Sequence, residues 1–118
     1  MPPRREPPPE TLEERWLLEA QTARNLEGLA AEQEGRLDDA VRLYERNVHE
    51  GFPGDWPYGR LVAIYEKRAA LDDAARVLRR AIAVLQDSSR RTAQDRRSLV
   101  RTFQKRLSLV EQRRAPPA

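Results

Sequence analysis

Three kinds of residue in this chain of 118 could take part in chemistry: one histidine, two pairs of adjacent aspartates and a run of basic residues near the C-terminus. A catalytic His49 would need a nucleophile or carboxylate converging on it, and no residue spacing indicates one. The pairs Asp38-Asp39 and Asp72-Asp73 could bind a metal ion, but adjacent acids at a helix start usually stabilise the helix dipole. The chain has no cysteine, glycine-rich phosphate loop or histidine pair at metal-ligand spacing. We therefore predict no enzyme activity, no metal and no cofactor.

The basic residues are concentrated in the C-terminal segment. Residues 88–118 hold nine Lys and Arg against two Asp and Glu, whereas residues 1–87 hold 13 against 17. Such a segment could contact the phosphate backbone of a nucleic acid, but no aromatic residue interleaves with its charges to stack on bases. The alternative that we favour is a solvated helix whose charges balance the acidic remainder of the chain. The candidate phosphate contacts are Arg90, Arg91, Arg97, Arg101 and Lys105.

The segment from Leu37 to Leu85 contains an internal duplication. Leu-Asp-Asp-Ala at 37–40 recurs at 71–74, a period of 34 residues. Behind each copy, apolar residues follow in steps of three and four, which places them on one face of a helix. A 34-residue period built from helical faces is typical of helix–turn–helix repeats, which stack because one unit cannot bury its own apolar face.

The flanking sequence predicts five helices and no strand. We expect them at about residues 12–34, 38–50, 57–69, 72–86 and 90–113, within one domain over 10–113. The proline-rich segment 1–9 is expected to be a disordered tail, and residues 114–118 a second tail. Thr11 and Glu14 form a capping box at the start of the first helix, and Gly35 favours its end. The apolar stripe expected on that helix is Leu12, Trp16, Ala20, Ala23, Leu26 and Ala30.

In this frame the chain resembles a tetratricopeptide repeat protein, with repeats at about 21–54 and 55–88. The matching residues are Gly28, Gly35, Ala40, Tyr44, Pro53, Tyr58, Leu61, Tyr65, Ala74 and Ala81. The sequence departs from the family where Arg24 and Glu27 replace large residues, Asn47 replaces a small one and Ala69 replaces a turn glycine. The resemblance implies an all-α fold in which antiparallel helix pairs stack as a short right-handed solenoid. The basic helix at about 90–113 would then be a long capping helix.

The resemblance also implies a function, which is non-catalytic protein–protein interaction as an adaptor or scaffold. In the family the first helix of each repeat lines a concave groove, and the groove here would suit a peptide of acidic character. Trp56, in a loop before Pro57, could equally line the site or pack. The alternative is a small nucleic-acid-associated protein that uses the basic helix. The lining positions carried over from the family are Asn25, Leu29, Glu32, Gly59, Arg60, Ala63 and Lys67.

The surroundings of the protein are indicated only broadly. No apolar run approaches the ~20 residues of a membrane span, and the N-terminus lacks the apolar centre of a signal peptide. Together with the absence of cysteine, these features make the cytoplasm the expected location. Repeat arrays usually need about three or more units, so two repeats leave self-association open.

Overall fold

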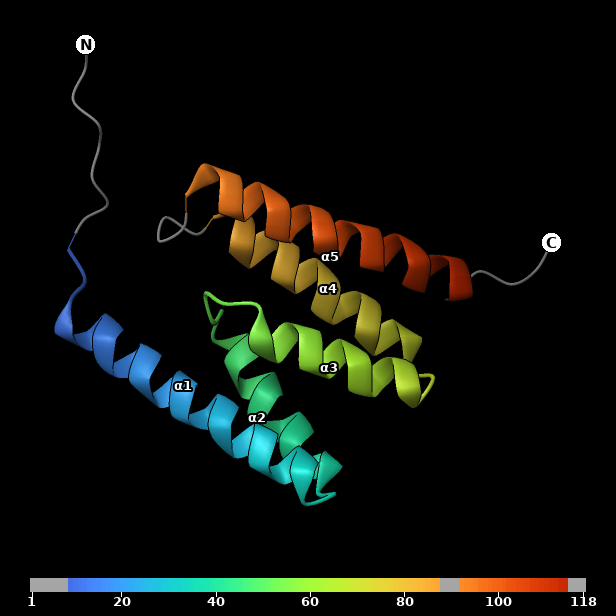
Figure 1. Ribbon diagram of the computed structural model, residues 1–118, viewed down its shortest axis with the longest axis horizontal. Helices are drawn as coiled ribbons and strands as arrows, with labels where there is room; N and C mark the ends of the chain where they lie inside the picture. The colour runs from blue at the N-terminus through green and yellow to red at the C-terminus, as the bar shows by residue number, and fades with distance from the viewer. Residues whose placement is uncertain (1–8, 88–91, 115–118) are drawn as a thin grey trace, which may run out of the picture.

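The computed structural model describes residues 9–87 and 92–114, which form five α-helices and no strand. The helices are α1 (Leu12–Gln33), α2 (Leu37–His49), α3 (Trp56–Lys67), α4 (Leu71–Gln86) and α5 (Ala93–Arg114). Consecutive helices pack against one another along the chain (Figure 1). The predicted all-α class is confirmed, with helix ends within a few residues of those expected. Most of the proline-rich segment, Arg90, Arg91 and the tail from 115 lie outside the described residues.

The turn between α1 and α2 has the same backbone geometry as the turn between α3 and α4. Gly35 and Ala69, 34 residues apart, have φ of 76° and 57°. Behind them, the amide of Arg36 bonds to Ala31 O at 2.8 Å and that of Ala70 to Tyr65 O at 2.8 Å. A left-handed residue that closes such bonds ends a helix. The sequence duplication is therefore matched by a duplicated backbone, and Gly35 ends the first helix as predicted.

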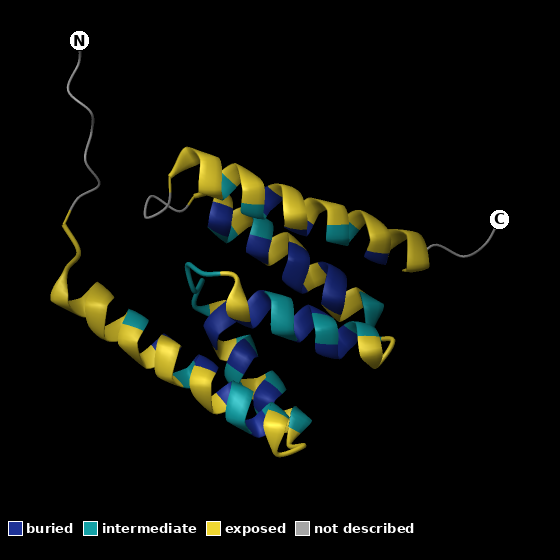
Figure 2. Ribbon diagram, in the orientation of Figure 1, coloured by how far each residue is buried: buried dark blue, intermediate teal, exposed yellow. Residues whose placement is uncertain are grey.

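The core of the described residues lies mainly among α2, α3 and α4, which carry most of the dark blue, buried residues in Figure 2. Small side chains sit where helices cross, since Ala40, Ala74 and Ala81 are fully buried. On α1, Gly28 allows an equally close approach, because a Cβ at this position would lie 2.5 Å from the Tyr44 ring. These small residues set the distances between neighbouring helices.

The apolar stripe predicted for the first helix is wrong as a core face. Leu12, Trp16 and Leu26 keep 64%, 63% and 64% of their surface exposed, and Ala20 and Ala23 are exposed too. The first half of α1 carries almost no buried residue, as Figure 2 shows. The buried positions of α1 are on the opposite side and are Gln21, Asn25, Gly28 and Ala31.

A polar network takes the place of that apolar contact. Asn47 of α2, fully buried, donates from Nδ2 to Gln21 O and Asn25 Oδ1, both at 2.8 Å. Arg24 donates to Asn47 Oδ1 at 2.6 Å and to Glu50 Oε1 at 2.8 Å. Because buried polar groups must find partners, Asn47 selects the polar side of α1 for burial. Two departures from the family pattern, Arg24 and Asn47, are thus one hydrogen-bonded pair.

The spacing of Leu99, Phe103, Leu107 and Val110 in steps of three and four predicts one apolar face for the basic helix. The helix α5 packs on α4 through this face. Val100, Phe103 and Val110 are buried, with Leu99 and Leu107 packed beside them. The helix begins later than expected, at Ala93, because the Thr92 hydroxyl accepts a bond from the amide of Asp95 at 3.1 Å and caps it.

Candidate functional site

A pocket of about 160 Å³ lies between the end of α1 and α3. It brings together Glu32 of α1 with Arg60, Ala63 and Lys67 of α3, four of the lining residues predicted from the sequence. Successive turns of α3 supply the last three. Leu37, Ile64 and Arg68 complete the lining.

Glu32 is the polar centre of this pocket. Its carboxylate accepts two hydrogen bonds from Arg60, at 2.5 and 3.1 Å, and one from the Tyr44 hydroxyl at 2.6 Å. The Glu32 side chain is only 11% exposed, so these bonds form largely away from water. Tyr44, a fully buried core residue, therefore also joins α2 to the pocket.

The protonation of this cluster is held in one state. Burial raises the pKa of Glu32, but the hydrogen bonds from Arg60 and Tyr44 outweigh it and leave the pKa below its usual value. The pKa of the Tyr44 phenol is raised, first by burial and then by its bond to the Glu32 carboxylate. Near neutral pH the cluster is a carboxylate between a cation and a neutral phenol. Such a cluster fixes the position of α3 against α1.

The other predicted groove residues are not gathered in the pocket. Asn25 is buried in the network with Asn47 and presents little surface to a partner. A Cβ built on Gly59 would lie 4.0 Å from the guanidinium group of Arg106 on α5. Trp56 opens α3 rather than lying in a loop and remains 43% exposed. Leu29 is partly exposed on α1, outside the lining of this pocket.

Two sets of basic residues can be distinguished on α5, apart from Arg96. Arg106 and Arg113 each pair with Glu66 at 3.4 Å, and Arg114 pairs with Asp72 at 2.7 Å. These residues fasten α5 to α3 and α4.

The other set is the predicted phosphate contacts Arg97, Arg101 and Lys105. They are exposed at four-residue intervals and have no ion pair with any described residue. Arg97 and Arg101 also line a shallow hollow of about 290 Å³ with Gln86 and Val100.

The residues first considered for chemistry take structural positions. His49 is exposed at the end of α2, and the aspartate pairs lie in the first turns of α2 and α4. The aspartates pair with cations, for example Asp38 with Arg68 at 2.9 Å. Over residues 9–87 and 92–114, no group of three or more potential ligand side chains is arranged to hold a metal ion.

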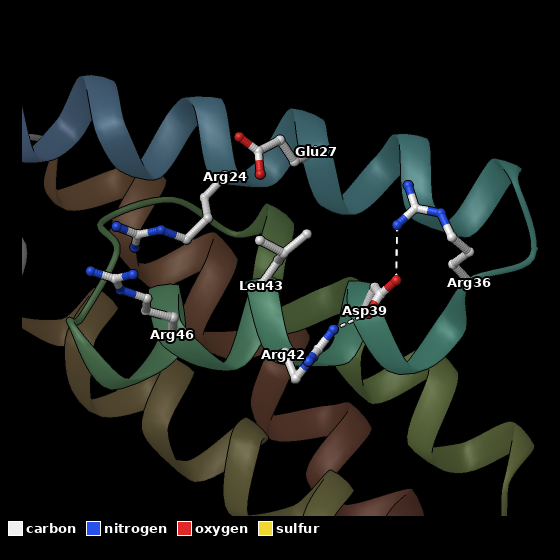
Figure 3. Close-up of a pocket in the computed structure, with 7 residues that line it drawn as sticks. All are labelled: Arg24, Glu27, Arg36, Asp39, Arg42, Leu43 and Arg46. Atoms are coloured by element: carbon white, nitrogen blue, oxygen red, sulfur yellow. Dashed lines mark hydrogen bonds and ion pairs between the residues drawn. The ribbon is translucent and has the colours of Figure 1, made fainter.

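A set of arginines that the sequence did not indicate as a binding site lines a second hollow, which we call the α1–α2 groove. It measures about 630 Å³, and Figure 3 shows Leu43 of α2 pointing toward α1 between Arg24 and Glu27. The signal was present in the duplication, since Arg42 and Arg46 recur 34 residues later as Arg76 and Arg80. The lining residues are Arg24, Glu27, Arg36, Asp39, Arg42, Leu43 and Arg46.

Comparisons with known proteins give no match: no protein-family model, no curated protein and no solved structure resembles the chain significantly. Within the described part of the chain, no helix combines the length and the apolar character needed to cross a membrane.

Proposed function

We propose that this protein is a non-catalytic protein–protein interaction module of the tetratricopeptide type, in which two helix pairs stack as a short right-handed solenoid capped by α5. The observation that carries the proposal is the turn that recurs 34 residues apart with the same left-handed residue and the same closing hydrogen bonds. The close contact of Gly28 with Tyr44 and the fully buried Ala40, Ala74 and Ala81 support it, because the family pattern has small residues at these helix crossings.

The proposed ligand is a peptide with acidic character, bound along the pocket between α1 and α3. Ala63 leaves room there, and Lys67 is exposed and has no ion pair among the described residues. Arg60 is already neutralised by Glu32, so Lys67 is the cation that remains for a carboxylate of the ligand. A rim cation mainly steers and orients a partner, which is the behaviour expected of an adaptor.

The test is affinity capture from the native source with three forms of the full chain as bait. Ala63→Arg fills the pocket, whereas Arg101→Glu changes a charge on the far side of α5 and serves as the control. The proposal expects at least one protein that the wild type and Arg101→Glu retain and that Ala63→Arg loses. Capture that is equal for all three forms would contradict it.

One observation favours a second candidate function, nucleic-acid association through α5. Arg97, Arg101 and Lys105 form a line on an exposed helix face, about 6 Å apart at 1.5 Å rise per residue, and none of the three has an ion pair with a described residue. Arg106, Arg113 and Arg114, by contrast, are ion-paired with α3 and α4, so this line is the part of α5 that we expect to contact phosphates. Such contacts are sequence-independent and sensitive to salt.

The two functions separate in a binding assay with a short random-sequence DNA duplex and a matched RNA hairpin. A phosphate-binding α5 predicts retention at low salt, affinity that falls steeply as salt rises, and loss of binding in Arg97→Glu with Arg101→Glu. The adaptor predicts no measurable affinity for either probe. Ala63→Arg should leave any nucleic-acid binding unchanged.

A further inference from the structure

The α1–α2 groove corresponds, residue by residue, to a surface that is covered in the second helix pair. Moving 34 residues along the chain turns its lining residues Arg24, Glu27 and Leu43 into Tyr58, Leu61 and Val77. These three counterparts are fully buried, and α2 packs against both α3 and α4. The α3/α4 pair thus carries a helix on the face that α1 and α2 leave open.

The contacts of two arginines show how that helix is held. Arg76 of α4 pairs with Glu45 of α2 at 2.5 Å, and Arg80 donates to the carbonyls of Val48 and His49 at 3.1 and 3.2 Å. The α2 helix therefore offers an acidic side chain and, one turn later, the carbonyls of its C-terminus. Cations near a helix C-terminus are favoured by its dipole.

The counterparts of these arginines in the α1–α2 groove lack such a helix. Among the described residues, Arg42 pairs only with Asp39 and Arg46 only with Glu50, both on or beside their own helix. Arg76 has the same pair within its helix, with Asp73 at 3.3 Å, and adds Glu45 from α2. Arg42 therefore keeps the local bond of Arg76, but among the described residues neither Arg42 nor Arg46 has a bond to a second helix.

The border of the groove on α1 is apolar. Ala23 lies one turn before Glu27 on the same side of the helix, and Leu26 stands beside it with 64% of its surface exposed. Two positions of this stripe, Ala23 and Ala30, correspond to Pro57 and Ile64, which are buried in α3. A helix in the groove would cover this stripe as well.

We propose that the α1–α2 groove is a docking site for an acidic amphipathic helix of a partner protein, seated as α2 is seated on α3 and α4. The partner's acid pairs with Arg42, its C-terminal carbonyls face Arg46, and its apolar side meets Leu43 and the exposed stripe of α1. A second copy of this chain is a poorer occupant, because the exposed face of its end helix α5 carries the cations Arg97, Arg101 and Lys105, which have the same sign as Arg42 and Arg46. The site rests on the duplication that also supports the proposed function, but it lies apart from the pocket between α1 and α3.

The probe for this site is a peptide of residues 37–50, the helix that fills the corresponding position in the second pair. Its own Arg42 and Arg46, exposed in α2, are replaced by a hydrocarbon staple, which holds the helix and leaves the peptide acidic. Preorganising a ligand in this way limits the ordering cost of binding. The readout is the methyl NMR spectrum of the full-length protein during titration with the peptide. We expect shifts at Leu43 and Leu26 and none at Leu109 on α5.

Charge reversal decides whether Arg42 recognises the acid. Arg42→Glu should weaken the stapled peptide about ten-fold or more, and a peptide carrying Glu45→Arg should bind this variant better than it binds the wild type. Arg101→Glu is the matched control and should leave the affinity unchanged. Because Arg42 is 77% exposed, its reversal is expected to leave the thermal melt nearly unchanged.

The proposal would be overturned if the peptide did not bind, or if Arg42→Glu left its affinity unchanged. It would also be overturned if the NMR shifts were confined to Ala63 and its pocket, or if shifts at Val77 showed that the peptide displaces α2. Concentration-dependent self-association that Arg42→Glu abolishes would also overturn it, by making a second copy the occupant. Ala63→Arg keeps the two proposals apart. This substitution should abolish capture of the partner that binds the pocket between α1 and α3, and it should leave the stapled peptide bound.

Discussion

The two helix pairs share a backbone and differ in what they bury. Between α1 and α2 the chain buries Gln21, Asn25 and Asn47, joined by hydrogen bonds. The second pair buries no polar side chain at the corresponding positions: Ala81 is fully buried in place of Asn47, while Asp55 and Gly59, the counterparts of Gln21 and Asn25, are an exposed residue and one without a side chain. An apolar contact stabilises in proportion to area and tolerates rotation, whereas a buried amide demands one set of partners. The comparison teaches that one buried asparagine can decide which side of an amphipathic helix faces inward.

The largest expected effect comes from removing a large buried side chain from either helix pair. Leu78→Ala should lower the free energy of unfolding by about 2–5 kcal/mol, because Leu78 is fully buried and its loss leaves a cavity. Tyr44→Ala, at the corresponding position, should cost a similar amount. Urea titrations followed by circular dichroism measure both variants. Either loss is large against a total of about 5–15 kcal/mol for a domain. A midpoint that is lowered in one variant and unchanged in the other would show that the two pairs are not equivalent.

Removing the amide of Asn47 breaks the polar pair. Asn47→Ala should cost about 1–3 kcal/mol, because Asn25 and Arg24 lose a partner while buried or half-buried. Adding Arg24→Tyr, which copies Tyr58 of the second pair, should recover part of the loss by removing the stranded cation. Thermal melts of the single and double variants test the coupling. A double variant no more stable than Asn47→Ala would mean that the network does not govern how α1 packs.

Glu32 joins the two pairs, and its contribution should depend on pH. Its folded pKa is lowered, so the stability that it provides is present above the unfolded pKa of about 4.3 and is lost as pH falls through the folded value. Glu32→Gln should cost about 1–2 kcal/mol near neutral pH, given a partly exposed Arg60. The wild type and this variant should approach each other in acid. Thermal melts across the acid range would contradict this if the gap stayed constant.

The smallest effect concerns the shared turn. Ala69 has a φ of 57°, which favours glycine, and Gly35 has a φ of 76° with open space around it. Ala69→Gly should therefore stabilise by up to about 1 kcal/mol, and Gly35→Ala should destabilise by about the same amount. Differential scanning calorimetry resolves shifts of this size. Equal responses of the same sign would show that the two turns differ in strain.

The elements were predictable from local signals. The capping box at Thr11, the turn at Gly35 and the apolar face of α5 depend on residues close in sequence, and all three are found in the structure. The packed side of α1 was not predictable from apolar periodicity, because the asparagine that selects it lies on α2. Four predicted groove residues meet in one pocket. Asn25 does not line this pocket, because its amide oxygen accepts a hydrogen bond from Asn47 in the buried network.

The contact between Gly28 and the Tyr44 ring has a consequence for how one pair could be converted into the other. The same two positions hold Val62 and Leu78 in the second pair, so a small and a large residue have been exchanged for two of middle size. Tyr44→Leu made first leaves a void, which the helices tolerate at a cost of a few kcal/mol, about that of other core truncations. Gly28→Val made first drives a Cβ to 2.5 Å from the ring, a clash that forces the helices apart. The order of the two substitutions therefore matters, because the intermediate with Tyr44→Leu alone is expected to fold, whereas the intermediate with Gly28→Val alone carries the clash.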